Sequence, residues 1–206
     1  MKKFKHSRKN LNLDQPEPKK RMSSKAILSI VLAGIMAVSI IGFVSTNIIS
    51  PTTEYNDIQF RQTPAGWVAE INEEEMLFTN HPLDVEHLNL SVEAAAALRD
   101  AKIIYVTSAV DDSLRESISQ TMYDLIPAFQ KKNIYAVLSF TENTTYNKPV
   151  VTCSNATAFV PVLYFRNSTT TQITNQNNCI IAEANAPINM IKIRDRLMYA
   201  VLGVIS

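Results

Sequence analysis

The sequence predicts an α/β protein: an N-terminal transmembrane helix, then one extracytoplasmic domain with a mixed sheet of about five strands and packed helices. Three observations support this class. An uncharged apolar run follows a basic arm, a strand–helix–strand pattern occupies residues 103–140, and an amphipathic segment fills residues 187–202. The predicted organisation is a basic cytoplasmic tail at 1–25, the transmembrane helix at 26–46, a linker at 47–58 and the domain at 59–206.

The membrane prediction depends on charge distribution. Residues 1–25 carry nine Lys/Arg and two Asp/Glu, whereas the remaining chain carries 11 and 17. Residues 26–49 carry no charge, and about 20 apolar residues suffice to cross a hydrocarbon core of about 30 Å. No Lys or Arg follows the run until Arg61, so the positive-inside bias predicts a cytoplasmic N-terminus. We therefore expect the lipid bilayer as a partner through residues 26–46.

Two alternatives to this interpretation were weighed. A cleaved signal peptide has an apolar region of about 7–15 residues, which is shorter than this run. A basic arm also suits nucleic acid or lipid headgroups, but here it is interpreted as a topology signal beside the apolar run. Nucleic acid is therefore not an expected partner.

Short-range patterns predict the elements of the domain. Trp67–Ile71 and Met76–Thr79 flank a polar turn and predict a hairpin. The further predicted elements are a short helix from Ser91, a helix at 113–130 and strands at 103–107, 134–140, 161–166 and 179–183. Ser113 and Glu116 have the spacing of a capping box, and Pro127 should kink or end that helix. Gly203 suits a helix C-cap after residues 187–202.

The strand–helix–strand unit has the length of a right-handed parallel crossover. Together with the later strands and the closing helix, its order is similar to that of thioredoxin-like proteins. The paired cysteines of those proteins are absent, so redox activity does not follow from the order.

Several short segments carry a resemblance to a known group. They are Pro64–Trp67, Thr152–Thr157, Asn178–Glu183, Asp195–Tyr199 and Leu202–Gly203. Together they resemble uncharacterised single-pass membrane-anchored archaeal proteins, over the anchor and the whole extracytoplasmic part. The resemblance implies the same topology and carries no activity or site residue.

Glycine and cysteine content excludes several enzyme classes. Only four glycines are present, and two of them, Gly34 and Gly42, lie in the apolar run. The dinucleotide fingerprint, the P-loop and the Gly-x-Ser-x-Gly elbow each need closely spaced glycines, so all three are absent. Two cysteines cannot form a four-Cys zinc site. No catalytic residue and no cofactor is predicted.

Cys153 and Cys179 are predicted to form one disulfide, because thiols outside the cytoplasm are usually oxidised. Two buried free thiols are the alternative, since unpaired cysteine is often buried. A reactive thiol is a third interpretation.

Four Asn-x-Ser/Thr sequons lie in the predicted outer part, at Asn89, Asn143, Asn155 and Asn167. They are glycosylation candidates, with unmodified polar loops as the alternative. Asn155 is the weakest candidate, because it lies beside Cys153 in a segment that we expect to be packed.

The candidate metal ligands His81, Asp84, Glu86 and His87 fall within seven residues. Their spacing matches no standard zinc motif, and Pro82 favours an extended backbone that would point alternate side chains to opposite faces. We interpret the segment as a solvated loop and predict no metal.

The leading functional hypothesis is a non-catalytic, membrane-anchored extracytoplasmic module that binds a protein or cell-envelope partner. An extracytoplasmic hydrolase or metal-dependent enzyme that uses residues 81–87 is one alternative. A pilin-like subunit is another, although the apolar helix lacks a glutamate near its start and a preceding glycine.

Overall fold

The computed structural model describes the backbone of residues 23–48 and 51–205, and the side chains of residues 23–39 and 51–205. The predicted tail at 1–25 therefore lies outside the described residues as far as residue 22. The chain divides into two compact units, residues 1–49 and 50–206, which are described separately below.

In the first unit, the described residues form one helix, α1 (Ser24–Ile48), of 25 residues. The predicted helix at 26–46 lies within it. Eight large apolar side chains between Ile27 and Val38 are each more than half exposed. In residues 23–39 and 51–205, no helix is long and apolar enough to cross a membrane.

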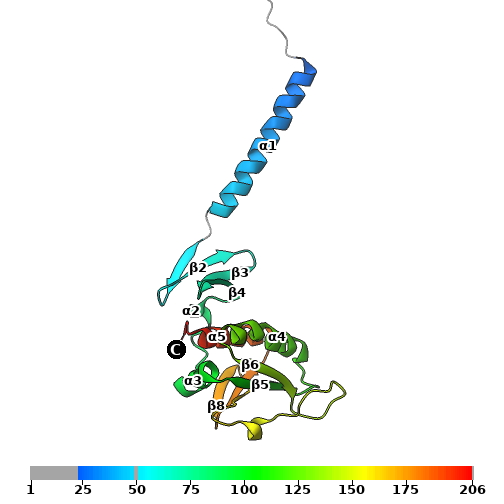
Figure 1. Ribbon diagram of the computed structural model, residues 1–206. Coiled ribbons are helices and arrows are strands. Elements are labelled where there is room, and N and C mark those ends of the chain that lie inside the picture. The colour runs from blue at the N-terminus through cyan, green and yellow to red at the C-terminus, as the bar shows by residue number, and fades with distance from the viewer. Residues whose placement is uncertain (1–22, 49–50, 206) are drawn as a thin grey trace, which may run out of the picture. The chain divides into compact units, whose positions relative to one another are not determined.

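The second unit begins with a four-stranded antiparallel meander in the order β1–β2–β3–β4 (Figure 1). Its strands are β1 (Thr52–Tyr55), β2 (Ile58–Thr63), β3 (Gly66–Ile71) and β4 (Glu74–Phe78). The turns at Asn56–Asp57 and Asn72–Glu73 each place two residues at positive φ. Two-residue hairpin turns of this kind match the twist of the strands that they join. The hairpin predicted around residues 67–79 is confirmed.

The meander corrects one prediction. Thr52–Tyr55 lies within the expected linker at 47–58 but pairs with β2. Its side chains are mostly exposed on an edge strand, so no apolar pattern marked it. Gly66 is required where β3 begins, because its φ is +137° and a Cβ there would lie 2.2 Å from the carbonyl oxygen of Phe78.

The prediction of a single sheet is wrong, because the meander forms a sheet of its own. The second sheet is mixed, and four of its five strands were predicted. Its order is β6–β5–β7–β9–β8, with β8 antiparallel to β9 and the other pairs parallel. Its strands are β5 (Ile103–Ser108), β6 (Tyr135–Phe140), β7 (Val162–Asn167), β8 (Gln172–Gln176) and β9 (Cys179–Ala184). The sequence did not predict β8, because its mostly polar residues show no clear alternation of apolar and polar side chains. A turn at Asn177–Asn178, again with two positive φ angles, joins β8 to β9.

Four helices complete the second unit. They are α2 (Pro82–Val85), α3 (Val92–Asp100), α4 (Arg115–Lys131) and α5 (Pro187–Leu202). Ser91 caps α3 by accepting a hydrogen bond from the Ala94 amide at 3.2 Å. Gly203 follows α5 in the left-handed conformation with φ +83°, as predicted.

The predicted N-cap of α4 is wrong, and of the two outcomes predicted for Pro127, an end of the helix does not occur. Ser113 does not cap the helix; instead the Asp112 carboxylate accepts from the amide of Leu114 at 2.7 Å and moves the start of the helix to Arg115. Pro127 does not end the helix, which continues to Lys131. Pro127 lies on the exposed side, whereas Ala128 and Phe129 are fully buried, so packing holds the last turn in helical form.

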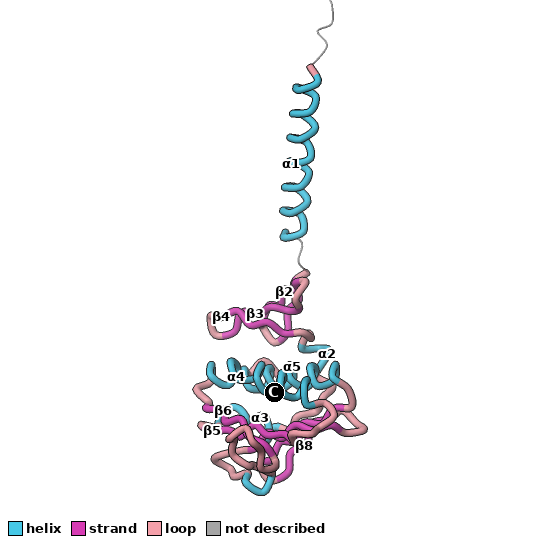
Figure 2. Tube along the Cα trace, turned by 90° about the vertical axis from the view of Figure 1, so that its right-hand side faces the viewer, coloured by secondary structure: helices cyan, strands magenta, loops and turns pink. Residues whose placement is uncertain are grey.

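The two sheets and the helices form layers within this unit. Figure 2 shows α4 and α5 between the meander and the five-stranded sheet. The main apolar core fills both interfaces of this helical layer, and its fully buried members include Phe60, Phe78, Leu125, Phe165 and Leu197. A smaller apolar cluster of Val151, Val162, Cys179 and Ile181 lies on the opposite face of the five-stranded sheet.

Candidate functional site

A buried charged cluster connects the segment after β4 with α4 and α5. Arg194 and Asp195 come from α5, Asp124 from α4, and Thr79 and Asn80 follow β4. The Asp195 side chain is 0% exposed and that of Arg194 14%. A buried carboxylate is tolerable only where hydrogen bonds and an opposite charge replace water.

Asp195 receives such bonds on both of its oxygens. Its Oδ1 accepts from Arg194 Nε at 2.9 Å and from Arg194 Nη2 at 2.8 Å. Its Oδ2 accepts from the backbone N–H of Asn80 at 2.7 Å and from the side-chain Nδ2 of the same residue at 2.8 Å. Arg194 also donates to Asp124 Oδ2 at 2.8 Å and to Thr79 Oγ1 at 2.7 Å.

Burial and charge act against each other within this cluster. Burial alone would lower the pKa of the Arg194 guanidinium, but Asp195 and Asp124 raise it above its ordinary value. Burial also raises the pKa of Tyr199, whose hydroxyl donates to the Asn80 carbonyl at 2.6 Å. The cluster therefore holds fixed charges and fixed hydrogen bonds, which fasten the end of the meander to the helices.

An apolar groove opens beside the charged cluster. Its volume is about 560 Å³, and Met76, Leu77, Tyr123, Ile126 and Met198 supply most of its apolar lining. Asp124 and Arg194 line one part of it. Pockets that combine apolar walls with a few convergent polar groups are the usual form of a binding site.

A second recess, called the polar recess after the charged and hydroxyl side chains in its lining, lies at the carboxyl ends of β5 and β6. Its volume is about 730 Å³, and its lining includes Arg115, Gln120, Tyr123, Phe140 and Tyr146. The carboxyl ends of parallel strands are where ligands bind in open α/β sheets, at points where successive strands leave in opposite directions. In this sheet β5 lies between β6 and β7, and the lining of the recess comes from the β5 and β6 side, from α4 and from the segment after β6.

Tyr123 lines both the apolar groove and the polar recess, and its side chain is 69% exposed. The two hollows therefore flank one stretch of α4, from Arg115 to Gln130. We call this stretch, with the groove and the recess, the α4 face.

The sequence-predicted metal ligands have separate structural roles. His81 caps α2, with Nδ1 accepting from the Leu83 amide at 3.3 Å and Nε2 lying 2.8 Å from Thr53 Oγ1. Asp84 accepts from the His81 amide, Glu86 accepts from the Tyr55 hydroxyl at 3.0 Å, and His87 is exposed. In the described ranges, no group of three or more His, Cys, Asp or Glu side chains is placed to hold a metal ion.

The expectation of an extended backbone at residues 81–87 is wrong, and so is that of a solvated His81, whereas Asp84, Glu86 and His87 are exposed as expected. Pro82 occupies the first position of α2, where its missing N–H costs nothing. His81 is only 5% exposed and contacts the rings of Tyr55, Phe60 and Trp67. This desolvation lowers the pKa of His81, although Asp84 opposes the shift.

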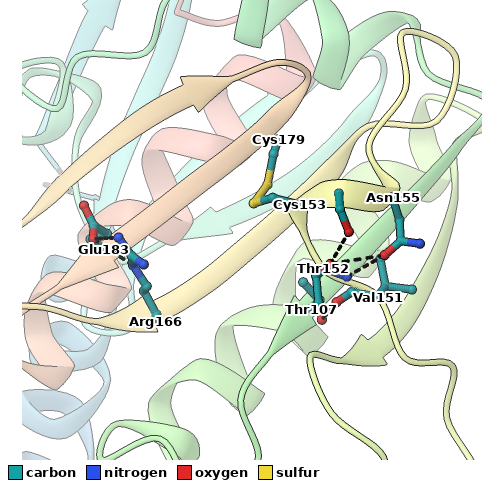
Figure 3. The surroundings of a disulfide bond; sticks show 9 residues. Thr107, Val151, Thr152, Cys153, Asn155, Arg166, Cys179 and Glu183 are labelled. Atoms are coloured by element: carbon teal, nitrogen blue, oxygen red, sulfur yellow. Dashed lines mark hydrogen bonds and ion pairs between the residues drawn. A yellow bond between two sulfur atoms is a disulfide. The ribbon is translucent and has the colours of Figure 1, made fainter.

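The predicted disulfide is confirmed. Cys153 and Cys179 are bonded, with their Cα atoms 5.2 Å apart. Figure 3 shows the bond joining β9 to the 3₁₀ turn at Cys153–Asn155. That turn belongs to the segment between β6 and β7, which crosses the outer face of the sheet, where Thr107 Oγ1 donates to the Val151 carbonyl at 2.9 Å. We call residues 141–161 the strap.

All four sequon asparagines, Asn89, Asn143, Asn155 and Asn167, are exposed. The Asn155 side chain also accepts from the Thr152 amide at 2.8 Å, so its carbonyl oxygen is engaged although the residue lies at the surface. The expectation that Asn155 is packed away is therefore wrong, and its accessibility does not distinguish it from the others.

Sequence reasoning missed the charged cluster and Tyr123. One signal was present: Asp195 and Arg196 interrupt the apolar stripe of residues 187–202, between Ile193 and Leu197. A charged pair inside a buried helix indicates a buried polar partner. No such signal marked Tyr123, since an exposed tyrosine on an amphipathic helix is ordinary.

No known protein family, curated protein or solved structure matches the chain.

Proposed function

We propose that this protein is a membrane-anchored extracytoplasmic module that binds a protein or cell-envelope partner through the α4 face. The observation that carries the binding proposal is Tyr123, which is 69% exposed and lines two adjacent hollows. Large aromatic side chains at the centre of a surface supply a high share of binding energy for the area that they bury.

Three features support the anchor and its orientation. Residues 26–49 carry no charge, and the eight large apolar side chains of α1 between Ile27 and Val38 are each more than half exposed. A basic arm precedes them, which favours a cytoplasmic N-terminus. The Cys153–Cys179 bond suits an oxidising compartment outside the cytoplasm.

The chemistry of the α4 face supports a partner with both apolar and polar groups. The apolar groove offers Leu77, 52% exposed, beside the ion pair of Arg194 and Asp124. The polar recess adds the hydroxyl of Tyr146 and the charges of Arg115 and Lys148. A protein segment or an envelope polymer that lies along α4 would contact both hollows at once.

Protease treatment of intact cells tests the location. A protease added outside should digest the part of the chain after Ser50 and leave an N-terminal epitope protected. An N-terminal epitope that is accessible from outside would overturn the proposed orientation.

Site-specific photocrosslinking in native membranes tests the binding face. A photoreactive phenylalanine analogue in place of Tyr123 should crosslink one defined protein or envelope polymer, identified by mass spectrometry. Tyr135, 70% exposed on β6, provides the matched control position. Crosslinks of equal yield and identity from both positions, or none from Tyr123, would overturn the α4 face as the binding surface.

A further inference from the structure

The four Asn-x-Ser/Thr sequons all lie in the second unit, and exposure of the asparagine does not distinguish them. Their contacts do. A glycan is joined to the asparagine amide nitrogen, and the hydroxyl two residues later belongs to the recognised motif. A transferase that acts on the folded chain therefore needs the amide, the hydroxyl and the backbone between them to be free to enter its active site.

The sequon at Asn89 is part of a helix start. Its middle residue, Leu90, is 5% exposed and belongs to the main core. Its hydroxyl group, on Ser91, caps α3 and accepts from the Ala94 amide at 3.2 Å. Presenting this sequon to an enzyme would expose a core leucine to water and uncap the helix.

The sequon at Asn155 has both of its functional groups engaged. The side-chain carbonyl of Asn155 accepts from the Thr152 amide at 2.8 Å and from the Thr152 hydroxyl at 3.3 Å (Figure 3). Two residues later, Thr157 Oγ1 accepts from the Val160 amide at 3.0 Å. The disulfide at Cys153 also fixes the backbone just before the sequon.

The sequon at Asn167 is held by its backbone. Asn167 is the last residue of β7 and pairs with Ala184 of β9. Its amide donates to the Asp112 carboxylate at 2.8 Å, and the Ser168 amide donates to the Ala184 carbonyl at 2.9 Å. The first two residues of this sequon would have to leave the sheet before an enzyme could bind them.

The sequon at Asn143 lies in an open loop at the start of the strap. Every residue from 141 to 150 is exposed or half-buried, and the loop supplies no residue to either apolar cluster. The Phe140 amide donates to the Pro149 carbonyl at 3.1 Å and closes the loop at its base. Within residues 23–39 and 51–205, the side chains of Asn143 and Thr145 make no hydrogen bond.

Two contacts within this loop leave the sequon available. Thr144 Oγ1 accepts from the Tyr146 amide at 3.2 Å, and both groups belong to the loop. The Tyr146 ring lies beside that of Phe140, with centroids 5.8 Å apart, but it is 64% exposed. Neither contact involves the Asn143 amide or the Thr145 hydroxyl.

We propose that Asn143 carries an N-linked glycan, added to the folded domain, and that the other three sequons stay unmodified. A bond forms between Asn143 Nδ2 and the anomeric carbon of a lipid-linked sugar phosphate. The bond from that carbon to the phosphate oxygen breaks, the lipid phosphate leaves, and the amide gives up one proton to a base of the transferase. The proposal rests on the extracytoplasmic location proposed above, where such an enzyme would meet the domain.

Glycopeptide mapping of the full-length protein from its native membranes tests the site. After proteolysis, mass spectrometry should show sugar residues on the peptide that contains Asn143. The peptides that contain Asn89, Asn155 and Asn167 should have their unmodified masses. A bare Asn143, or equal occupancy of all four sequons, would overturn the proposal.

Variants of the loop test the linkage. Asn143→Gln removes the acceptor and Thr145→Ala removes the hydroxyl of the motif, so each should lose the whole glycan mass. Thr145→Ser should keep it. Thr144→Ala, at the middle position of the same sequon, is the matched control and should keep it as well. Loss of the glycan in Thr144→Ala but not in Asn143→Gln would show an O-linked sugar and contradict the proposal.

Protease treatment of the same intact cells separates this proposal from the proposed location. A domain that external protease digests, but whose Asn143 is bare, would overturn the glycan and leave the location standing. A domain that is protected from external protease would overturn the location and the glycan together.

Discussion

The two faces of the five-stranded sheet are covered by different means. The inner face packs Leu163, Phe165 and Ile180, each 0% exposed, into the main core beneath α4 and α5. The outer face carries a small cluster around Val162 and Ile181, beneath the strap. Many apolar contacts hold the helices in place, whereas the strap has one disulfide and a few hydrogen bonds.

This difference arises from how much apolar surface each cover offers. A helix of 16 or 17 residues presents a continuous apolar stripe and buries it against the sheet. The strap is rich in Thr and Asn. Its burial therefore contributes too little free energy to offset the conformational entropy that the segment loses when it becomes ordered. A covalent link compensates by restricting the unfolded chain. The two faces should therefore respond differently to mutation and to reductant.

The largest expected effect is at the buried charge on the inner side. Asp195→Ala removes the carboxylate that two Arg194 nitrogens and two Asn80 nitrogens contact. Without it, Arg194 keeps only Asp124 as a charged partner and two Asn80 N–H groups lose their acceptor, so the free energy of unfolding should fall by about 3–5 kcal/mol, measured by urea denaturation. Asp124→Ala, at a partner whose side chain is 27% exposed, should cost clearly less. Equal losses would show that burial does not decide the energy of this cluster.

The disulfide is expected to come next. Its closed loop runs from Cys153 to Cys179, for which the chain-entropy model gives about 3.5 kcal/mol. Cys153→Ser and Cys179→Ser should each lower the melting temperature equally, with no further loss in the double variant. Reductant should lower the melting temperature of the unaltered protein and leave the melting temperature of the double variant unchanged. Two free thiols in the unfolded, unreduced protein would contradict the bond.

A smaller effect is expected from the hydrogen bond between Thr107 and the strap. Thr107→Val keeps the shape of the side chain and removes the donor to the Val151 carbonyl. The loss should be about 1 kcal/mol, with faster amide hydrogen exchange confined to the strap. If exchange rose equally in α4 and α5, the two faces would not be independent.

The smallest expected effect is a pH dependence on the meander side. Burial holds the pKa of His81 below its ordinary value, so the unfolded chain binds the proton more readily than the folded protein. The contribution of His81 to stability is present above pH of about 6.5 and is lost as pH falls toward the folded-state pKa. His81→Asn should remove this slope from chemical denaturation curves between pH of about 5 and 7. His87→Asn, at an exposed histidine, should retain it.

The pattern of residue types along the sequence predicted most helices and strands. It failed where contact with a distant segment decides the local backbone conformation. The strands at residues 103, 134, 161 and 179 were predicted because each is a short apolar run rich in β-branched or aromatic residues. Among them β9, which is paired on both sides, is buried along its whole length. The strands β1, β2 and β8 were missed because each is mostly polar and shows too little apolar alternation to be recognised. Pro82 was assigned to an extended segment, but His81 caps a helical turn there while its ring packs against Phe60 and Trp67.

Local sequence and composition were enough to predict most of the helices and strands, the apolar run at 26–49 and the pairing of the two cysteines, because each of these depends on neighbouring residues or on residue counts. Only the tertiary structure decided that Asp195 meets Asn80 across 115 residues, that Tyr123 stands between two hollows, and that Asn167 meets Asp112 across 55 residues. These juxtapositions arise from how helices and loops pack on the sheets. No local sequence pattern predicts these contacts, because each residue acquires its neighbours only when the sheets and helices pack together.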